Sequence, residues 1–182
     1  GSRGIRIVNS TKSRYDLLFN EKPSSLYCSF DDYLEAIGEN SIPRLVVSEY
    51  LPGNEVTVDS LVVNGEPKVI LVRQRDAMRE GISVAGHFID SKDVEDQVRS
   101  IVKAIPGLNG PVGFQFKMSE SGRYALLESN PRLQGTSVAA QGLGYNFPQE
   151  ALQLSLGEIV ETPHRTAKVG FRRYYQEVFF EL

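Results

Sequence analysis

Five polar side chains in one stretch of the sequence have the types needed to bind a metal ion and a phosphoryl group. They are Gln115, Lys117, Glu128, Asn130 and Arg132. A carboxylate oxygen and two amide oxygens suit a hard cation such as Mg²⁺, which also takes oxygens from phosphates. An arginine just beyond them can form a forked contact with a phosphoryl group or an acyl phosphate. The pattern predicts a metal and phosphate site, with a solvated hairpin face as the alternative.

A hairpin around Ser121-Gly122 would bring this set together. If these two residues form the turn, counting outward puts Gln115 directly opposite Glu128, on one face of the pair. Asn130 follows on the same face because side chains alternate with period two. The other face is expected to be apolar and to join the core, with Phe114, Phe116 and Leu127.

Other candidate site residues lie earlier in the chain. Glu49 and Glu55 flank a tight turn at Pro52-Gly53. This segment is interpreted either as an exposed charged edge or as a hinge whose backbone binds adenine and whose Glu55 binds ribose hydroxyls. Arg73 and Arg75 alternate to one face of a strand, where they either share an anion or balance nearby acids.

Weaker signals come from isolated residues. Gly1-Ser2-Arg3-Gly4 precedes a strand and could hold a phosphate through backbone N–H groups, although a remnant of cloning is the alternative. His87 is expected to be an ordinary surface or core histidine. Cys28 is the single cysteine, so no internal disulfide forms, and a small core residue is the favoured interpretation over a nucleophile.

The predicted elements alternate between strands and helices, with a lobe boundary near Pro52-Gly53. Ser10 is expected to cap the first helix, Ser29 or Asp31 the second, Ser91 the third and Asn146 the last. Asn64-Gly65 is the expected turn of a hairpin. The expected strands are 5–9, 45–50, 55–63, 68–75, 112–118, 124–130, 168–175 and 177–180, and the expected helices are 12–19, 31–38, 92–105 and 148–156. The sum is an α+β chain with mainly antiparallel sheet.

The bulk composition limits the class of protein. The chain has 182 residues, of which 41% are hydrophobic and 24% charged, with a formal net charge of −3. This is the balance of an ordinary globular domain, and the charge argues against nucleic-acid binding. No apolar run is long enough for a membrane span, and no signal peptide is recognised at Gly1–Gly4. The single cysteine predicts a cytoplasmic protein.

The motifs together resemble one family. Gly113-Phe114-Gln115-Phe116, Leu127-Glu128-Ser129-Asn130-Pro131-Arg132 and Gly142-Leu143-Gly144-Tyr145 resemble the C-terminal lobe of ATP-grasp enzymes, and look closest to the carbamoyl-phosphate synthetase large subunit. The match extends from Gly1 to about Gly157. The resemblance implies an ATP-grasp fold, with residues 1–50 in the small lobe and 51–182 forming the C-terminal lobe.

The resemblance also implies roles for residues. Gln115, Glu128 and Asn130 would be ligands of Mg²⁺ or Mn²⁺, and Arg132 and Arg75 would contact the phosphates or substrate. Most ATP-grasp enzymes have a glutamate where this chain has Gln115; glutamine is usual in the synthetase branch. The remaining implied contacts are to ATP, with Gly1, Ser2, Arg3 and Gly4 as the lid over the phosphates, Glu49 and Leu51 at adenine and Glu55 at the ribose. No family role aligns with His87.

The implied activity is that of an ATP-dependent ligase. ATP would phosphorylate a small carboxylate, and an amine or ammonia would attack the acyl phosphate. In the family a substrate-binding domain and the first part of the ATP lobe precede the glycine-rich loop, so this chain is expected to be part of a longer domain. The alternatives are a ligase that makes a peptide-like or modified sugar product, and a non-catalytic nucleotide-binding scaffold or regulatory module. The apolar stretch Val178-Phe179-Phe180 is expected to pair either with another segment of the longer domain or with a partner chain, which would give a homo-oligomer.

Overall fold

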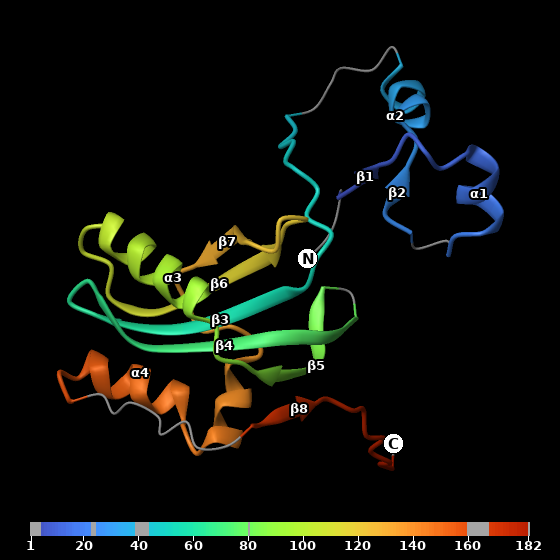
Figure 1. The fold of residues 1–182 in the computed structure, drawn as a ribbon. Coiled ribbons are helices and arrows are strands. Elements are labelled where there is room, and N and C mark those ends of the chain that lie inside the picture. The colour runs from blue at the N-terminus through green and yellow to red at the C-terminus, as the bar shows by residue number, and fades with distance from the viewer. Residues whose placement is uncertain (1–4, 23–24, 39–43, 80, 160–167, 182) are drawn as a thin grey trace. The chain divides into compact units, whose positions relative to one another are not determined.

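The computed structural model describes residues 5–22, 25–38, 44–79, 81–159 and 168–181. The chain separates into two compact units, residues 1–50 and residues 51–182. Figure 1 shows the elements of each unit along the chain. The assignment of these units to the two lobes of an ATP-grasp domain stays a prediction.

The first unit contains a two-stranded parallel sheet and two short helices. Its elements are β1 (Ile7–Val8), α1 (Arg14–Phe19), β2 (Tyr27–Cys28) and α2 (Phe30–Ile37). Ser13 caps α1 in a capping box with Asp16, so the predicted cap at Ser10 was wrong. The bond from the Ser13 hydroxyl is the main reason that the pKa of Asp16 lies below its usual value. Ser29 caps α2, and Gly38 ends it, as predicted.

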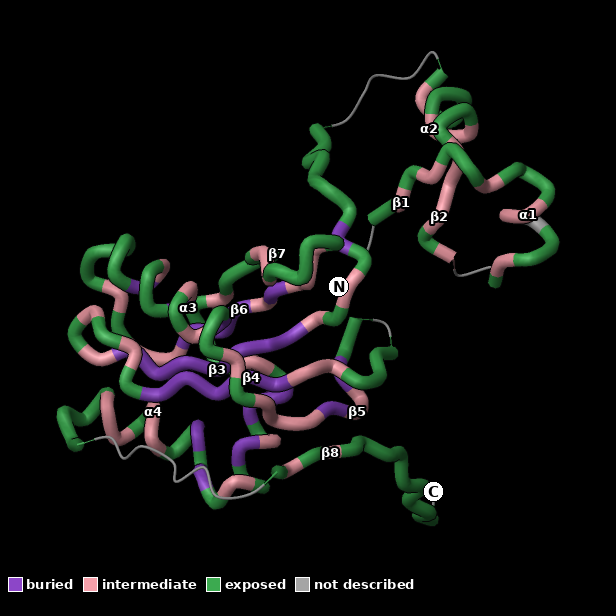
Figure 2. Tube along the Cα trace, in the orientation of Figure 1, coloured by how far each residue is buried: buried purple, intermediate pink, exposed green. Residues whose placement is uncertain are grey.

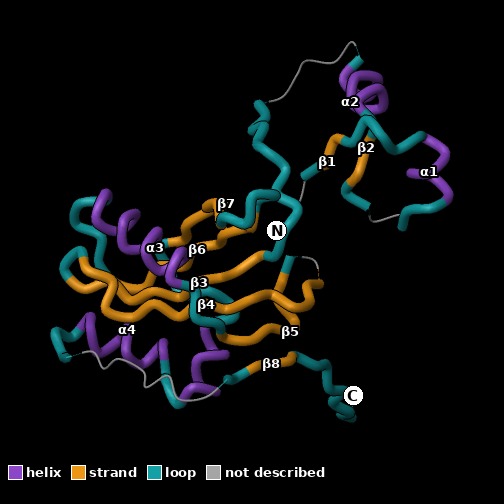
Figure 3. The backbone as a smooth tube through the Cα atoms, in the orientation of Figure 1, coloured by secondary structure: helices purple, strands orange, loops and turns teal. Residues whose placement is uncertain are grey.

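The predicted strand at 45–50 is absent. Residues 44–50 have no regular secondary structure and are all exposed, and Figure 3 shows this segment as loop. Val46 and Val47 are 97% and 91% exposed. β-branched side chains favour a strand when they pack on a pleated, partly buried surface. These two valines have no such surface among the described residues, so their propensity alone did not produce a strand.

The second unit is built on a six-stranded antiparallel sheet in the order β7-β6-β3-β4-β5-β8. The strands are β3 (Glu55–Val63), β4 (Glu66–Arg79), β5 (Ile82–Phe88), β6 (Gly110–Met118), β7 (Tyr124–Asn130) and β8 (Gly170–Arg172). Asn64 and Gly65 both have positive φ, at 52° and 77°, and form the predicted turn between β3 and β4. β4 is longer than predicted, and β5 was not predicted.

One face of this sheet is covered by α3 (Lys92–Ala104). The helix and the sheet share one buried apolar cluster. Because each buried valine or phenylalanine side chain contributes about 1.5–3 kcal/mol, this layer fixes the position of β6 and its neighbours. The buried members of the cluster are Val56, Val58, Val62, Ile70, Val72, Val94, Val98, Val102, Val112, Phe114 and Phe116. Figure 2 shows the buried segments running along β3 and β4.

The opposite face is covered at one end by the 3₁₀ helix η1 (Ser137–Leu143) and by α4 (Phe147–Ser155). Figure 1 shows α3 and α4 on opposite faces of the sheet. Asn146 caps α4 as predicted, whereas η1 was not predicted. The second buried cluster consists of Leu61, Val69, Leu71, Ala140, Tyr145 and Phe147.

The last part of the chain forms less sheet than predicted. Only Gly170–Arg172 pairs, with β5, in place of the predicted strands at 168–175 and 177–180. Val178, Phe179 and Phe180 are exposed, so they gain no sheet contacts in the described structure. Among the described residues, no helix combines the length and apolar character needed to cross a membrane.

Candidate functional site

The face of the sheet that packs on η1 and α4 becomes polar toward its other end. Leu61 lies in the apolar cluster, and the residues that alternate with it along β3 are Asp59, Thr57 and Glu55. Thr57 pairs with Gln115 of β6, and Glu55 pairs with Lys117. The face therefore passes from an apolar cluster, through a buried carboxylate at Asp59, to a polar end that includes Gln115.

Three of the predicted metal ligands meet at this polar end. Gln115 pairs with Glu128 in the β6–β7 ladder, which confirms the predicted pairing. The Nε2 atom of Gln115 donates a hydrogen bond to Oε1 of Glu128. Asn130 Nδ2 donates to the same oxygen at 2.9 Å. The carboxylate of Glu128 is exposed and is the common acceptor of both amides.

The hairpin reaches this pairing by a different route from the predicted one. Met118 pairs with Tyr124, so the connection spans residues 119–123, and the two-residue turn was wrong. A register shift between the Gln115 and Phe116 pairs leaves Leu127 as an extra residue on β7. Phe116 therefore pairs with Leu126. Leu127 is 49% exposed, which corrects the prediction that it joins the core; Phe114 and Phe116 are buried as predicted.

Arg75 connects this cluster to the central strands. Its Nη1 atom donates a hydrogen bond to Oε1 of Glu55, with which it forms an ion pair. The same Nη1 atom donates to Oε1 of Gln115 at 3.2 Å. Its Nη2 atom donates to the Gly81 carbonyl at 2.5 Å. The Arg75 side chain is only 7% exposed, so its charge is balanced mainly by Glu55. Arg75, Glu55, Gln115 and Glu128 thus form one continuous polar chain across β4, β3, β6 and β7.

Arg132 follows the end of β7, just beyond the residues of this polar cluster in the sequence. Its backbone N–H donates to the Asn130 carbonyl at 2.8 Å, which closes a tight turn at the end of β7. Its side chain is exposed and donates from Nη1 to the Leu133 carbonyl at 3.0 Å. The guanidinium therefore lies near the surface, two residues beyond the predicted ligand Asn130.

The predicted nucleotide contacts are distributed over both units. Gly1, Ser2, Arg3 and Gly4 lie outside the described residues. Glu49 is exposed in the first unit, and Leu51 is buried in the second, with 7% exposure. Their roles at adenine stay predictions, as does the ribose role of Glu55, whose carboxylate is bonded to Arg75.

The donor set at Glu128 fits a Mg²⁺ ion that is shared with phosphates. Where the structure is described, no group of three or more His, Cys, Asp and Glu side chains could hold a metal. The predicted set has one carboxylate and two amides, so a cation there needs further oxygens. Mg²⁺ commonly binds through one or two carboxylates together with substrate phosphates. Each amide must turn by 180° to present its oxygen in place of its NH₂ group.

The sequence did not identify Asp59 as the partner of Arg73 in a buried ion pair. Arg73 Nη2 donates to Oδ2 of Asp59 at 2.5 Å, and the two side chains are 1% and 2% exposed. Ser137 Oγ and Gln134 Nε2 donate to the other carboxylate oxygen, at 2.6 Å and 3.0 Å. Arg73 thus balances a nearby acid, which was one of its two interpretations. The alternation that put Asp59 on the face of Glu55, and Arg73 on that of Arg75, was the available signal.

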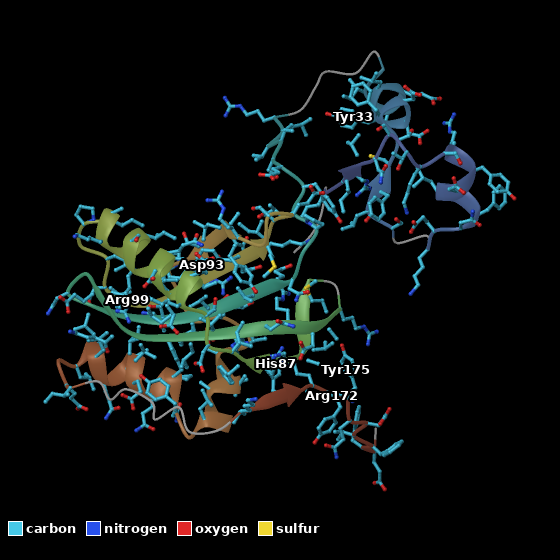
Figure 4. The ribbon with its side chains drawn as sticks, viewed as in Figure 1. Tyr33, His87, Asp93, Arg99, Arg172 and Tyr175 are labelled. Atoms are coloured by element: carbon cyan, nitrogen blue, oxygen red, sulfur yellow. The ribbon has the colours of Figure 1, made fainter. Side chains whose placement is uncertain are left out.

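His87 takes no part in the polar cluster. It lies on β5, at some distance from the β6–β7 hairpin (Figure 4). Its Nδ1 atom is 2.8 Å from Oδ2 of Asp76, and both side chains are partly exposed. This partly exposed position beside Asp76 agrees with the expectation of a surface histidine.

Solved structures share the fold of this chain. The N5-carboxyaminoimidazole synthetase from Staphylococcus aureus matches with a TM-score of 0.57 and 13% identity over 66% of this chain and 35% of the other. The phosphoribosylaminoimidazole carboxylase ATPase subunit from Aquifex aeolicus matches with a TM-score of 0.58 and 14% identity, over 71% of this chain and 42% of the other. The chain thus spans less than half the length of these structures, and identities this low establish the fold alone.

The family was found by a different comparison. No curated protein matches the chain. Residues 41–177 match the family described as ATP-grasp in the biosynthetic pathway with Ter operon. This range includes most of the chain, with the whole β3–β7 sheet and the polar cluster at Glu128. The chain therefore has the α+β ATP-grasp fold and belongs to this ATP-grasp family.

Proposed function

We propose that this chain is the Mg·ATP-binding part of an ATP-dependent ligase that activates a carboxylate for attack by an amine or ammonia. The observation that carries the proposal is the meeting of Gln115 and Asn130 at one oxygen of Glu128. Membership of an ATP-grasp family supports ATP as the bound nucleotide. One solved S. aureus synthetase structure with this fold is a complex with ADP.

The proposed site uses positioning and charge in place of a nucleophilic side chain. The γ-phosphoryl group of ATP passes to a carboxylate oxygen, and ADP leaves. The amine then attacks the acyl carbon, and phosphate leaves. In phosphoryl transfer most of the catalysis comes from orientation and neutralisation of charge. Glu128, Asn130 and Gln115 would hold Mg²⁺ against the phosphates, and Arg132 would contact the transferred group.

The Gln115 amide would have two orientations in the proposed site, and Arg75 contacts it in one of them. Gln115 presents its oxygen to Arg75 and its NH₂ group to Glu128. When the amide turns its oxygen toward a cation, the bond from Arg75 is lost. With the Gln115 amide turned, one N–H of the Arg75 Nη1 group would be free to donate to a phosphate or to the carboxylate substrate, while Glu55 and the Gly81 carbonyl would still hold the guanidinium. Glu55 is shared in the same way between Arg75 and the proposed ribose contact.

The finer proposal is a reaction of the carbamoyl-phosphate synthetase type, in which the carboxylate is bicarbonate. Gln115 supports it, because this position is a glutamine in the synthetase branch. A glutamine supplies an oxygen without a second negative charge, so the ion keeps more of its positive charge for the phosphates. Other small carboxylates remain the alternative substrates, as for ligases that make peptide-like products.

ADP release by the full-length protein tests the proposal. The protein is incubated with Mg·ATP alone, with bicarbonate, and with a panel of small carboxylates, each with and without ammonia or amino acids. Carboxylate-dependent ADP release is the expected result. Bicarbonate dependence would support the synthetase type. Mg·ATP binding without ADP release under any of these conditions would indicate a non-catalytic nucleotide-binding scaffold, and no nucleotide binding at all would refute the proposal.

A further inference from the structure

We propose that Asp59 is a positioning residue, which acts through Gln134 and Ser137 to fix the segment 130–134 that includes Asn130 and Arg132. The part of this inference that concerns catalysis rests on the proposed Mg·ATP site. Asp59 itself lies below the surface of the sheet face, with 2% exposure, and contacts no candidate ligand.

Both oxygens of the Asp59 carboxylate are held by specific donors. Oδ2 accepts from Arg73 at 2.5 Å, while Oδ1 accepts from Ser137 Oγ at 2.6 Å and from Gln134 Nε2 at 3.0 Å. A buried charge that accepts several hydrogen bonds has little freedom to turn. The orientation of this carboxylate therefore determines where the side chains of Gln134 and Ser137 lie.

Arg73 supplies the fixed end of this network. Its guanidinium carbon lies 6.0 Å from the ring centroid of Phe88 and 5.8 Å from that of Phe171. Its side chain is 1% exposed, and Thr57 and Phe88 are its partners on the neighbouring strands. The cation is thus held by the sheet and by two aromatic rings. Arg73 therefore anchors the Asp59 carboxylate to the central strands of the sheet.

Gln134 connects the Asp59 network to the segment that contains the predicted ligand Asn130. Its Nε2 atom also donates to the Val58 carbonyl at 2.8 Å, and its side chain lies over Gly113, where an added Cβ would come within 2.3–2.6 Å of its atoms. Gly113 is also the residue that pairs with Asn130. Residues 131–133 are therefore held at both ends over one glycine of β6.

Ser137 completes the attachment from the following turn. The Gln134 N–H donates to Ser137 Oγ at 3.0 Å, and the Ser137 N–H donates to the Gln134 carbonyl at 3.1 Å. The Ser137 hydroxyl is thus a bridge between the turn and Asp59. If this polar network served stability alone, apolar side chains of similar volume would serve as well, because buried ion pairs often give no net stabilisation. What the polar network adds beyond stability is a fixed conformation of the segment 130–134.

Limited proteolysis measures this effect without any ligand. Trypsin cleaves after Arg132, and Arg132 and Leu133 are both exposed. In the full-length protein, Gln134→Met keeps the volume but removes both donated bonds, and Ser137→Ala removes the hydroxyl. Each variant is expected to be cut at Arg132–Leu133 about 10-fold faster than wild type, because local opening follows the loss of hydrogen bonds to a buried charge. Mass spectrometry follows this bond separately from other sites.

A matched control separates local release from general destabilisation. Val98→Ala truncates a buried side chain of α3, on the opposite face of the sheet. It is expected to lower thermal stability while leaving cleavage at Arg132–Leu133 near the wild-type rate. Ser137→Thr retains the hydroxyl and is expected to restore protection. If cleavage in Gln134→Met and Ser137→Ala rises no more than in Val98→Ala, the positioning role is refuted.

Kinetics then tests the connection to the proposed site. The ribose and adenine contacts lie elsewhere in the proposal, so ATP turnover in Ser137→Ala is expected to show a kcat lowered about 10-fold and a KM for ATP changed much less. Faster cleavage combined with wild-type kcat and KM would overturn the catalytic part of the inference. Failure of the proposed function itself is recognised separately, because wild type would then bind and turn over no ATP, whereas the proteolysis compares variants without nucleotide.

Discussion

Gln115 and Glu128 face each other across the β6–β7 ladder, and the amide of Gln115 donates to the carboxylate of Glu128. Asn130 donates to the same carboxylate oxygen from two residues further along β7. This arrangement satisfies a single negative charge with two neutral donors. A cation would replace both N–H donors, and the two amide oxygens would then become ligands in their place.

Glu128→Gln is expected to weaken Mg²⁺-dependent ATP binding by about 10-fold or more, because the set loses its single charge and hard cations bind chiefly through carboxylates. Isothermal titration with Mg·ATP, and with ATP in the presence of EDTA, measures the metal-dependent part. Glu120→Gln, at the exposed connection between the same two strands, is the control and should bind as wild type does. Equal loss in both variants would indicate a general charge effect, not a metal ligand.

The position of Gln115 opposite Glu128 was predicted correctly, although the turn was not. A two-residue turn at Ser121-Gly122 gives this pairing only if the ladder continues without interruption. The structure has a five-residue connection, and the additional residue Leu127 on β7 restores the register. A bulge depends on how the strand packs at the sheet edge, which alternation within the hairpin does not show.

Arg75→Gln is expected to lower the free energy of unfolding by about 1–3 kcal/mol, because the Glu55 carboxylate then loses its cation in a largely buried place. Arg75→Lys should recover part of the loss, since it keeps the charge but not the forked geometry. Urea denaturation measures both. Arg99→Gln on the exposed side of α3 is the comparison and should change stability by no more than about 0.5 kcal/mol. A loss in Arg75→Gln no larger than in Arg99→Gln would show that the pair contributes little.

The buried network at Asp59 marks the limit of what the sequence alone provides. The alternating pattern of β3 puts Asp59 on the same face as Glu55, and the same pattern in β4 puts Arg73 on the same face as Arg75. Neither pattern shows that Gln134 and Ser137, more than 70 residues further along the chain, approach the same carboxylate. That contact depends on how η1 packs on the sheet, and no periodic signal predicted η1. Local rules thus predicted most strands of the large sheet and the pairing of Gln115 with Glu128, while the supporting contacts depend on tertiary packing.

Asp59→Asn and Arg73→Met should each destabilise the protein by about 3–5 kcal/mol, because each leaves an uncompensated charge in the interior. The double variant should lose clearly less than the sum, since the two residues act as one unit. Urea denaturation of the four proteins gives the coupling energy. Lys68→Gln, which removes an exposed pair with Glu66, is the control and should show no measurable change. Additive losses in the free energy of unfolding would mean that the two side chains contribute to stability independently of each other.

Gly113→Ala tests the contact that connects Gln134 to the sheet. A Cβ at this position would lie 2.3 Å from Gln134 Cδ and 2.4 Å from its Cγ, so the glutamine side chain must move off the glycine. The expected cost is about 1–3 kcal/mol, as for other insertions into a well-packed place. Because Gln134 also donates to Asp59 and to the Val58 carbonyl, the displacement should also free the segment that contains Arg132.

Gly135→Ala is the matched comparison for this substitution. It lies one residue beyond Gln134, and a Cβ there meets nothing within 4 Å, so stability should change by no more than about 0.5 kcal/mol. Thermal unfolding reports the global effect, and amide hydrogen exchange over residues 130–137 reports the local one. We expect faster exchange in Gly113→Ala alone. Similar exchange in the two variants would show that Gln134 tolerates the added methyl group and that its place over Gly113 does not hold the turn.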